Sequence, residues 1–307
     1  MQESYRGRYE KLKRERRKRR RRFMAVFSFV LIVVAVIFWG IPALSPDTPD
    51  EDVVEVFRPD SPVHTSVPTL SIALSEAENT RFLELVNFEH PIRHPPNYDV
   101  FVMAYPNVPA QSAGLLLHEQ VISAVADWLD AASSANIEDF FVASGYRDIE
   151  TQRELFRHAE NTSLVKPAGH SEHHTGLAVD IAIPGVPLHE MEGLPAVLWL
   201  YETAWEHGFI QRYTEGTYHI TGILHEPWHF RYVGLPHAYY MWQNDLVLEE
   251  YLAHLQNEGV INIVVRGQVF EVWHQIPEDG RIYVPQHLPF TLSSDNMGGY
   301  IVTVQIS

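Results

Sequence analysis

Cysteine is absent from the 307 residues of the chain. The chain therefore has no disulfide and no thiolate nucleophile, and any metal must be held by His, Asp or Glu side chains. Charged residues make up 20% and hydrophobic residues 46% of the sequence. This composition is ordinary for a globular protein and excludes a wholly disordered or collagen-like chain.

Lysine and arginine are scarce beyond the N-terminus. Residues 1–22 hold 12 Lys/Arg and 3 Asp/Glu, so the formal net charge of −16 divides into +9 there and −25 elsewhere. Lys166 is the only lysine after Lys18. Because nucleic acids are polyanions, this acidic body is a poor candidate for binding them, and we expect no nucleic-acid partner.

An uncharged run follows the basic tail. Residues 23–44 contain no charged side chain, and a helix needs roughly 20 apolar residues to cross a bilayer. We predict a transmembrane anchor here. The basic residues 1–22 then form a cytoplasmic tail, and the body of this single-pass cell-membrane protein lies outside the cytoplasm. The alternatives are a cleavable signal peptide and a nucleic-acid-binding or nuclear-localising arginine run.

The remaining chain divides by composition. Residues 45–80 contain five prolines among acidic residues, which predicts an extended linker. We expect a main domain over residues 81–258 and a β-rich module over residues 259–307. Periodicity and turn residues predict helices over 114–133, 148–159 and 194–207, with Asp148 as an N-cap and Gly208 as a C-cap. They predict strands over 140–144, 176–183, 260–265, 268–273, 282–284, 290–292 and 300–306, with a turn at Arg266-Gly267 and a hairpin-like region over 209–232.

One motif places an acid among very small side chains. In a strand over 176–183, Asp180 shares its face with Gly176 and Ala178, and the opposite face carries the bulky core residues. His173 lies in the turn before this strand. The pattern indicates a face that leaves room for a ligand; the alternative is a buried strand with a hydrogen-bonded aspartate.

A second motif adds an imidazole and a carboxylate. Glu226 and His229 are three residues apart, and zinc enzymes that split amides pair an imidazole ligand with a carboxylate base. Pro227 argues against a helix, so the other ligands must come from elsewhere. His173 and Asp180 can supply them, which leaves one position of a tetrahedral zinc open. The alternative for His229 is a hydrogen-bonded core histidine.

A third motif offers a cation for a carboxylate. Arg147 follows Ser144-Gly145-Tyr146, and Gln152 comes five residues later. A guanidinium binds a carboxylate through two parallel hydrogen bonds. The alternative is a surface arginine paired with one of many acids.

These motifs resemble those of a known family. S-G-Y-R at 144–147, S-E-H-H-T-G-L-A-V-D at 171–180 and T-G-I-L-H-E-P-W-H-F-R-Y-V-G at 221–234 are similar to the zinc D-alanyl-D-alanine carboxypeptidases of the VanY type, peptidase family M15. The resemblance extends over roughly residues 81–307, including the C-terminal strands. It implies an α+β fold with a small antiparallel sheet flanked by helices and carrying a zinc site.

The resemblance also implies residue roles. His173, Asp180 and His229 match the family's zinc ligands, and Glu226 matches its catalytic base. Arg147 matches an arginine that binds substrate and helps to stabilise the oxyanion. Gln152 and Ser171 match residues that line the pocket for the terminal carboxylate. His170, His174 and His225 are extra imidazoles that we do not expect to be ligands.

The implied reaction removes the last D-alanine from peptidoglycan precursors that end in D-Ala-D-Ala, in wall remodelling or in vancomycin-type resistance. Two rivals stay open. One is an L,D-carboxypeptidase that trims tetrapeptide stems on the same scaffold. The other is a non-catalytic, zinc-containing wall-binding module, which would need neither Glu226 nor Arg147.

Overall fold

The computed structural model describes Lys18 and residues 54–57, 66–67, 69–93, 100–104, 108–137 and 139–307. The chain divides into two units, Met1–Val53 and Val54–Ser307, and the second unit contains all the elements below. The predicted cytoplasmic tail, apart from the helical residue Lys18, and the predicted anchor at residues 23–44 lie outside the described residues.

The predicted localisation is corrected. In the described part of the chain, no helix is long and apolar enough to cross a membrane. Helix α2, for example, has 16 residues, which span only about 24 Å at 1.5 Å per residue, and it carries charged side chains. The structure therefore does not support a membrane-anchored protein with a cytoplasmic N-terminus and an extracytoplasmic body.

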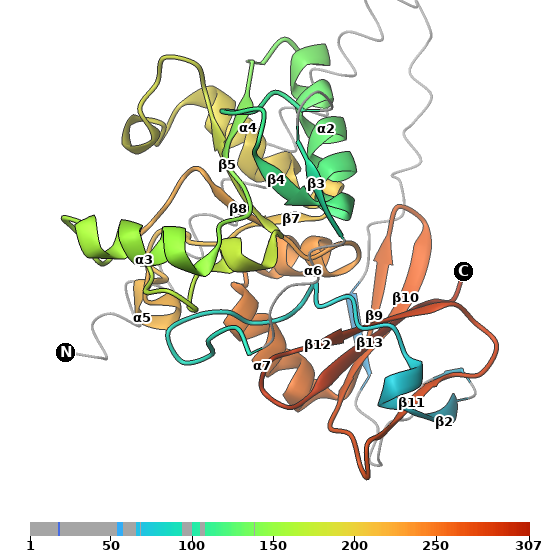
Figure 1. Cartoon of the computed structure of the whole chain (residues 1–307). Coiled ribbons are helices and arrows are strands. Elements are labelled where there is room, and N and C mark those ends of the chain that lie inside the picture. Colours follow the sequence, from blue (N-terminus) through green and yellow to red (C-terminus); the bar gives the residue numbers. More distant parts are fainter. Residues whose placement is uncertain are drawn as a thin grey trace, which may run out of the picture. The chain divides into compact units, whose positions relative to one another are not determined.

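A four-stranded antiparallel sheet forms the centre of the main body (Figure 1). Its strands, in spatial order, are β5 (Phe141–Ser144), β6 (Ala178–Ala182), β8 (His229–Tyr232) and β7 (Phe209–Gln211). Every residue of β6 is buried, which explains its run of small and branched apolar side chains. The predicted α+β class with a small antiparallel sheet flanked by helices is confirmed.

Two helices pack on this sheet through an apolar core. They are α2 (Glu119–Ser134) and α4 (Pro195–Thr203), which continues into the 3₁₀ turn η5 (Ala204–His207). Trp128 of α2 is fully buried and stacks on Phe209, 5.2 Å between ring centroids. Gly208 ends the turn at φ 80°, and this confirms the predicted C-cap, because glycine accepts a left-handed backbone without strain.

The structure shortens one predicted helix. Residues 114–133 were expected to be helical throughout, but β4 (Leu116–His118) pairs with β3 (Phe101–Met103) before α2 begins. An apolar triplet fits a strand as well as a helix, and the pairing partner lies outside the local pattern. His118 then caps α2 by accepting from the backbone amide of Gln120.

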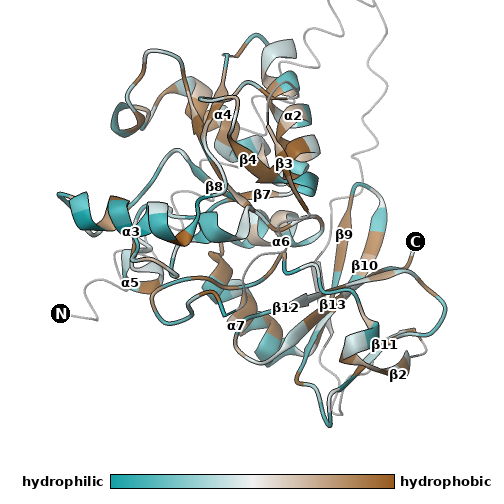
Figure 2. Cartoon of the chain, in the orientation of Figure 1, coloured by the Kyte–Doolittle hydropathy of each residue, from teal (hydrophilic) through white to brown (hydrophobic). Residues whose placement is uncertain are grey.

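Helix α3 (Ile149–His158) follows β5 and confirms the predicted helix with Asp148 as its N-cap. The Asp148 side chain accepts from the backbone amide of Thr151 at 2.6 Å. Figure 2 shows α3 coloured mostly as hydrophilic, and Gln152 is its only buried residue. The helix therefore lies on the surface and presents one polar side chain inward.

A second sheet of five strands has one strand from the start of the second unit and four strands that follow α6 (His237–Asn244) and α7 (Leu248–Glu258). Its order is β1 (Val54–Phe57), β9 (Val260–Val265), β10 (Gln268–Gln275), β13 (Tyr300–Gln305) and β12 (Phe290–Ser294). The predicted turn at Arg266-Gly267 is confirmed, since both residues have positive φ. The predicted C-terminal strands are also present, and β11 (Arg281–Pro285) pairs with β2 (Thr69–Ala73).

Strands β1 and β2 lie in the segment that the sequence assigns to an extended linker, residues 45–80. Both pair with strands near the C-terminus, so parts of that segment belong to the folded unit. The division at residue 258 into a main domain and a β-rich module stays a prediction.

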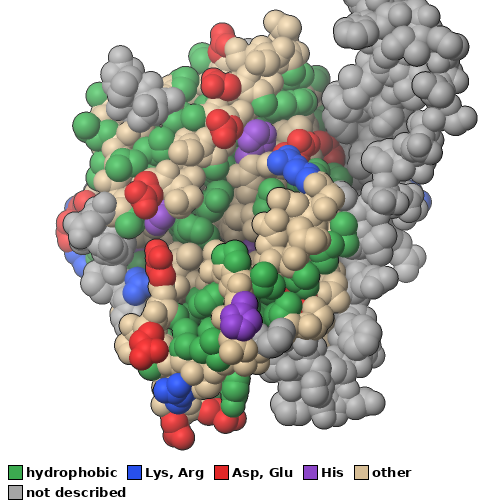
Figure 3. Space-filling view, turned by 90° about the vertical axis from the view of Figure 1, so that its right-hand side faces the viewer, with side chains coloured by type: hydrophobic (Ala, Val, Ile, Leu, Met, Phe, Trp, Pro, Cys, Tyr) green, Lys and Arg blue, Asp and Glu red, His purple; other side chains and the backbone are tan. Residues whose placement is uncertain are grey.

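The remaining short elements lie in loops of the main body and just after β2. They are η1 (Leu74–Glu76), η3 (Glu172–Thr175), η4 (Leu188–Glu190) and α5 (Tyr218–Thr221). On the face drawn in Figure 3, acidic side chains are spread over the described surface and basic ones are few, as the charge distribution of the sequence predicts.

Candidate metal centre

His173, Asp180 and His229 form one buried group. Each offers a ligand atom, and these atoms lie within 4.8 Å of one another. Asp180 Oδ1 lies 3.0 Å from His229 Nδ1, and Asp180 Oδ2 lies 3.4 Å from His173 Nε2. Two imidazole nitrogens and one carboxylate oxygen in this arrangement fit the ligand preferences of zinc.

The strand pairing brings these residues together. Asp180 on β6 and His229 on β8 are direct cross-strand partners, so their side chains share a face of the sheet. His173 comes from η3, which ends at Gly176 with φ 70°. A side chain at Gly176 would also meet the Phe101 ring at 2.5 Å, so this turn into β6 requires glycine.

A hydrogen bond to the backbone fixes the orientation of the His173 ring. Its Nδ1 donates to the carbonyl oxygen of Gly145 at 2.7 Å, which leaves Nε2 facing Asp180 with a lone pair for a metal. Gly145 must be small, because a Cβ there would lie 2.5 Å from the backbone oxygen of Leu116. The S-G-Y-R motif therefore orients a predicted ligand as well as supplying the arginine.

Glu226 lies beside His229, with its Oε2 3.9 Å from Nδ1 of the imidazole. Its backbone amide donates to the Tyr213 carbonyl, which fixes the loop before β8. Glu226 is only 6% exposed, and burial raises the pKa of its carboxyl to about 8. A raised pKa makes the ionised carboxylate more basic than a solvated one, so that it accepts a proton from water more readily.

Arg147 is held by two side chains. Its Nη1 donates to Gln152 Oε1 at 2.8 Å, and its Nη2 donates to Ser144 Oγ at 2.9 Å. Gln152 in turn donates to the Lys166 carbonyl. Burial lowers the pKa of Arg147, although a guanidinium stays charged at neutral pH.

All seven residues that the sequence singles out line one cavity of about 270 Å³. Among them, Ser171 also caps η3 by accepting from the backbone amide of His173. The other lining residues are Leu155, Leu164, Val165, Lys166, Tyr213, Ile223 and Trp228. The cavity thus combines a metal-ligating group, a carboxylate and a guanidinium.

The three extra histidines contact groups outside the His/Asp/His group. His170 contacts the carbonyl oxygen of Asn87, and His174 contacts that of Arg147. His225 contacts the Tyr213 carbonyl and the Glu192 carboxylate. None of them belongs to the metal-ligating group found among the described residues.

The imidazoles and the carboxylate of the group shift one another's pKa. Burial acts against the charged forms, yet hydrogen bonds to Asp180 and Glu172 raise the pKa of His229 to about 9. The imidazoles hold the pKa of Asp180 well below its usual range despite burial. A proton bound to His229 would compete with a divalent cation for this imidazole, because a histidine ligand must be neutral.

Comparisons with known proteins agree with this geometry. The family model described as VanY, D-alanyl-D-alanine carboxypeptidase, matches residues 114–235. A D-alanyl-D-alanine carboxypeptidase of Enterococcus faecium is 34% identical over 229 residues, covering 72% of this chain and 74% of that protein. The chain belongs to the VanY family of D-alanyl-D-alanine carboxypeptidases.

Two solved structures resemble this VanY-family chain. The D,D-dipeptidase VanXYg, in complex with a D-Ala-D-Ala phosphinate analog, is 26% identical, and the match covers 78% of this chain and 100% of that one, with a TM-score of 0.65. The LD-carboxypeptidase LdcB is 32% identical, and the match covers 56% of this chain and 86% of that one, with a TM-score of 0.50.

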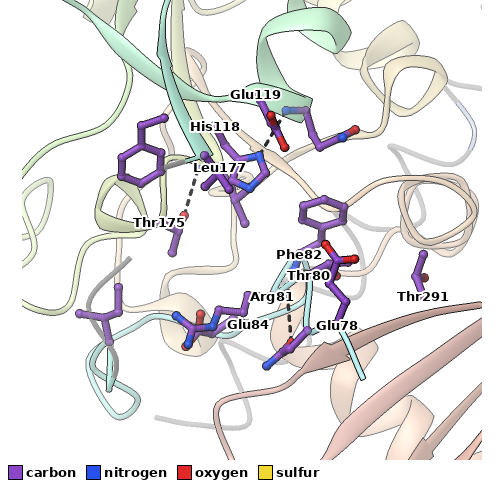
Figure 4. Close-up of a pocket in the computed structure, with 15 residues that line it drawn as sticks. Glu78, Thr80, Arg81, Phe82, Glu84, His118, Glu119, Thr175, Leu177 and Thr291 are labelled. Atoms are coloured by element: carbon purple, nitrogen blue, oxygen red, sulfur yellow. Dashed lines mark hydrogen bonds between the residues drawn. The ribbon is translucent and has the colours of Figure 1, made fainter. Parts of the chain in front are cut away.

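A larger cavity, about 580 Å³, lies elsewhere in this VanY-family chain. Figure 4 shows Arg81, Phe82, His118 and Glu119 among its lining residues. It contains none of the seven residues named above. We therefore place the candidate active site in the smaller cavity, which brings together the His/Asp/His group, Glu226 and Arg147.

Sequence reasoning missed four charged residues at or behind this site. Lys166 lines the cavity, and its Nζ donates to the Thr221 carbonyl. Glu172, Arg212 and Arg231 form a buried cluster behind His229. The rarity of lysine could have drawn attention to Lys166. Glu172 lies inside the S-E-H-H motif, but its partners are distant in sequence.

Proposed function

We propose that the chain is a zinc carboxypeptidase that removes the terminal D-alanine from peptidoglycan precursor peptides ending in D-Ala-D-Ala. The observation that carries this proposal is the single cavity that gathers the His/Asp/His group with Glu226 and Arg147. A binding module would need the metal ligands at most, whereas hydrolysis needs a proton acceptor and a cation beside them.

His173, Asp180 and His229 are the proposed zinc ligands. When bound, zinc supplies a Lewis acid that activates water and polarises the scissile amide. The hydrogen bond from His173 to the Gly145 carbonyl orients this imidazole for zinc binding. Three protein ligands leave one position for the reactants, as in other catalytic zinc sites.

Glu226 is the proposed proton carrier. Its Oε2 takes a proton from the attacking water and delivers it to the leaving amine of D-alanine. Burial raises the pKa of Glu226, so the carboxylate is basic enough for the first transfer. Its neutral form then donates in the second transfer. No covalent intermediate with a serine is required.

Arg147 is the proposed cation for the substrate. Because Gln152 and Ser144 fix its guanidinium, its donors are oriented before substrate arrives, which favours oxyanion stabilisation. Gln152 and Ser171 line the same cavity, and we propose that they contact the terminal carboxylate of the substrate. An exopeptidase must recognise that free carboxylate to choose the last residue.

The D,D specificity is favoured over L,D specificity by the extent of the similarity. Two matches to D,D enzymes cover 72% and 78% of the chain. A further D,D carboxypeptidase covers 60%, and the LD-carboxypeptidase covers 56%. The L,D reaction on tetrapeptide stems is the second candidate, because LdcB shares the fold at 32% identity.

Wall remodelling and glycopeptide resistance would use the same D,D reaction, and either role is compatible with this proposal.

The test is product analysis by mass spectrometry with a zinc-loaded chain. A pentapeptide stem ending in D-Ala-D-Ala should lose one D-alanine. The C-terminal amide of this peptide should react at least about tenfold more slowly, because a charge-assisted hydrogen bond is lost. A tetrapeptide stem should remain uncleaved. Exclusive cleavage of the tetrapeptide would establish the L,D alternative. Equal cleavage of acid and amide would contradict an exopeptidase.

A further inference from the structure

A second carboxylate lies on the side of the His229 ring that faces away from Asp180. Glu172 Oε2 is 3.4 Å from His229 Nε2, while His229 Nδ1 faces Asp180. The Glu172 side chain has no exposed surface. The two nitrogens of this imidazole thus face two carboxylates, one on each side of the ring.

Two buried arginines hold Glu172 in place. Its other oxygen, Oε1, accepts from Arg212 Nε at 2.8 Å and from Arg231 Nη1 at 3.1 Å. Both guanidinium groups are fully buried. Because both cations bind Oε1, Oε2 is left to face the imidazole. A buried carboxylate needs this degree of pairing, since an unpaired one would be too costly to desolvate.

The arginines are themselves anchored to separate parts of the fold. Arg231 Nη2 donates to the backbone oxygens of Phe82 and Glu84. Arg212 Nη2 donates to Glu249 Oε1 on α7 at 2.7 Å. The two arginines are therefore anchored independently of each other, Arg231 by the segment before β3 and Arg212 by α7.

From this arrangement we infer that Glu172 is a positioning residue for the metal site, acting through His229. An anionic acceptor at Nε2 keeps the ring proton there, fixes the ring plane and leaves the Nδ1 lone pair free for a metal. The inference rests on the proposed function, in which His229 binds zinc through that nitrogen.

The two histidine ligands are thus held in different ways. His173 is fixed by a neutral carbonyl at Nδ1, whereas His229 is fixed by a carboxylate at Nε2. One 3₁₀ turn, η3, supplies both the ligand His173 and the residue that orients the other ligand. The strand alternation of β8 adds Arg231 two residues after His229, on the same face.

The test compares Glu172→Gln with Glu249→Gln. Both changes remove a carboxylate that contacts Arg212, but only Glu172 contacts His229. Zinc affinity is measured by competition with a chromophoric chelator, and cobalt substitution reports ligand geometry by visible absorption. Thermal unfolding of the metal-free proteins measures how far each change affects the fold alone.

We expect zinc to bind about 10- to 100-fold more weakly to Glu172→Gln, as for other changes to a residue that orients a histidine ligand. The cobalt spectrum should change as well. Glu249→Gln should keep wild-type affinity and spectrum, even if it unfolds at lower temperature. Turnover of Glu172→Gln at saturating zinc should recover most of the wild-type rate, because no reacting group is lost.

Glu172→Asp serves if the glutamine variant does not fold. It keeps the charge for the arginines but withdraws the carboxylate from His229, so it should also weaken zinc binding. Zinc affinity within about twofold of wild type in either folded variant would overturn the inference, as would failure of both variants to fold. If the wild-type chain itself binds no zinc, the proposed function fails instead.

Discussion

The two sides of His229 carry the same types of residue in opposite electrostatic states. On the cavity side, burial raises the pKa of Glu226 to about 8, and its neighbour Arg147 is bound to Gln152 and Ser144 rather than to a carboxylate. On the interior side, burial alone would raise the pKa of Glu172, but Arg212 and Arg231 outweigh it and hold that pKa well below its usual range.

The difference follows from contacts, not from residue type. A carboxylate that must exchange protons cannot be clamped by two guanidinium groups, because they would remove its basicity. A carboxylate that orients an imidazole must keep its charge, and direct ion pairs ensure this. In the proposed function, each task therefore has its own glutamate, with Glu226 for proton transfer and Glu172 for positioning.

The most severe disruption is His229→Ala, which removes the residue that both sides share. We expect loss of more than about 100-fold in zinc affinity, beyond the effect of changing an orienting residue, and loss of turnover with it. Equilibrium dialysis with metal analysis measures the first and peptide hydrolysis the second. His189→Ala, at an exposed histidine, should change neither. Wild-type zinc affinity without His229 would remove it from the ligand set.

Arg147→Ala affects only the cavity side. We expect kcat/KM for a peptide ending in D-Ala-D-Ala to fall by about 10²- to 10³-fold, as when an oxyanion-stabilising donor is lost. The preference for the free acid over the amide should shrink, and zinc content should stay unchanged. Arg153→Ala, an exposed arginine on α3, is the matched control. A full acid preference in Arg147→Ala would show that other residues recognise the carboxylate.

Lys166→Met gives a smaller effect on the cavity side. Burial lowers the pKa of Lys166 to about 8 from 10.5, so between these values the unfolded chain holds a proton that the folded chain has released. Wild-type stability must then rise with pH relative to the variant over this window. We expect the difference in thermal midpoint to shift by about 2–4 °C between pH 7 and 10.5. A constant difference would contradict a lowered pKa.

The residues facing the cavity could be predicted from the sequence because they lie in compact motifs. Asp180 follows from strand alternation, and His173 and His229 flank it in short, recognisable segments. The orienting cluster could not be predicted in this way. Glu172 meets Arg212 and Arg231 from 40 and 59 residues away, and only the sheet pairing brings them together.

Prediction of the fold from the sequence has the same limit, because only local patterns can be read. Helix α3 and the C-terminal strands carry local signals, namely the Asp148 cap and the Arg266-Gly267 turn, and they were predicted. Strands β1 and β2 lie in a proline-rich acidic stretch and gain their structure from partners more than 200 residues away, as Val54 pairs with Ile263 and Ile72 with Ile282. Such pairing leaves no local pattern.

The most direct test of the separation between proton transfer and positioning compares Glu226→Gln with Glu172→Gln in zinc affinity and in kcat at saturating zinc. Glu226→Gln should bind zinc within about threefold of wild type and lose about 10²- to 10⁴-fold in kcat, the usual contribution of a general base. Glu172→Gln should show the reverse pattern. Turnover of Glu226→Gln at the wild-type rate would contradict the assignment of the proton carrier and, with it, the division of labour around His229.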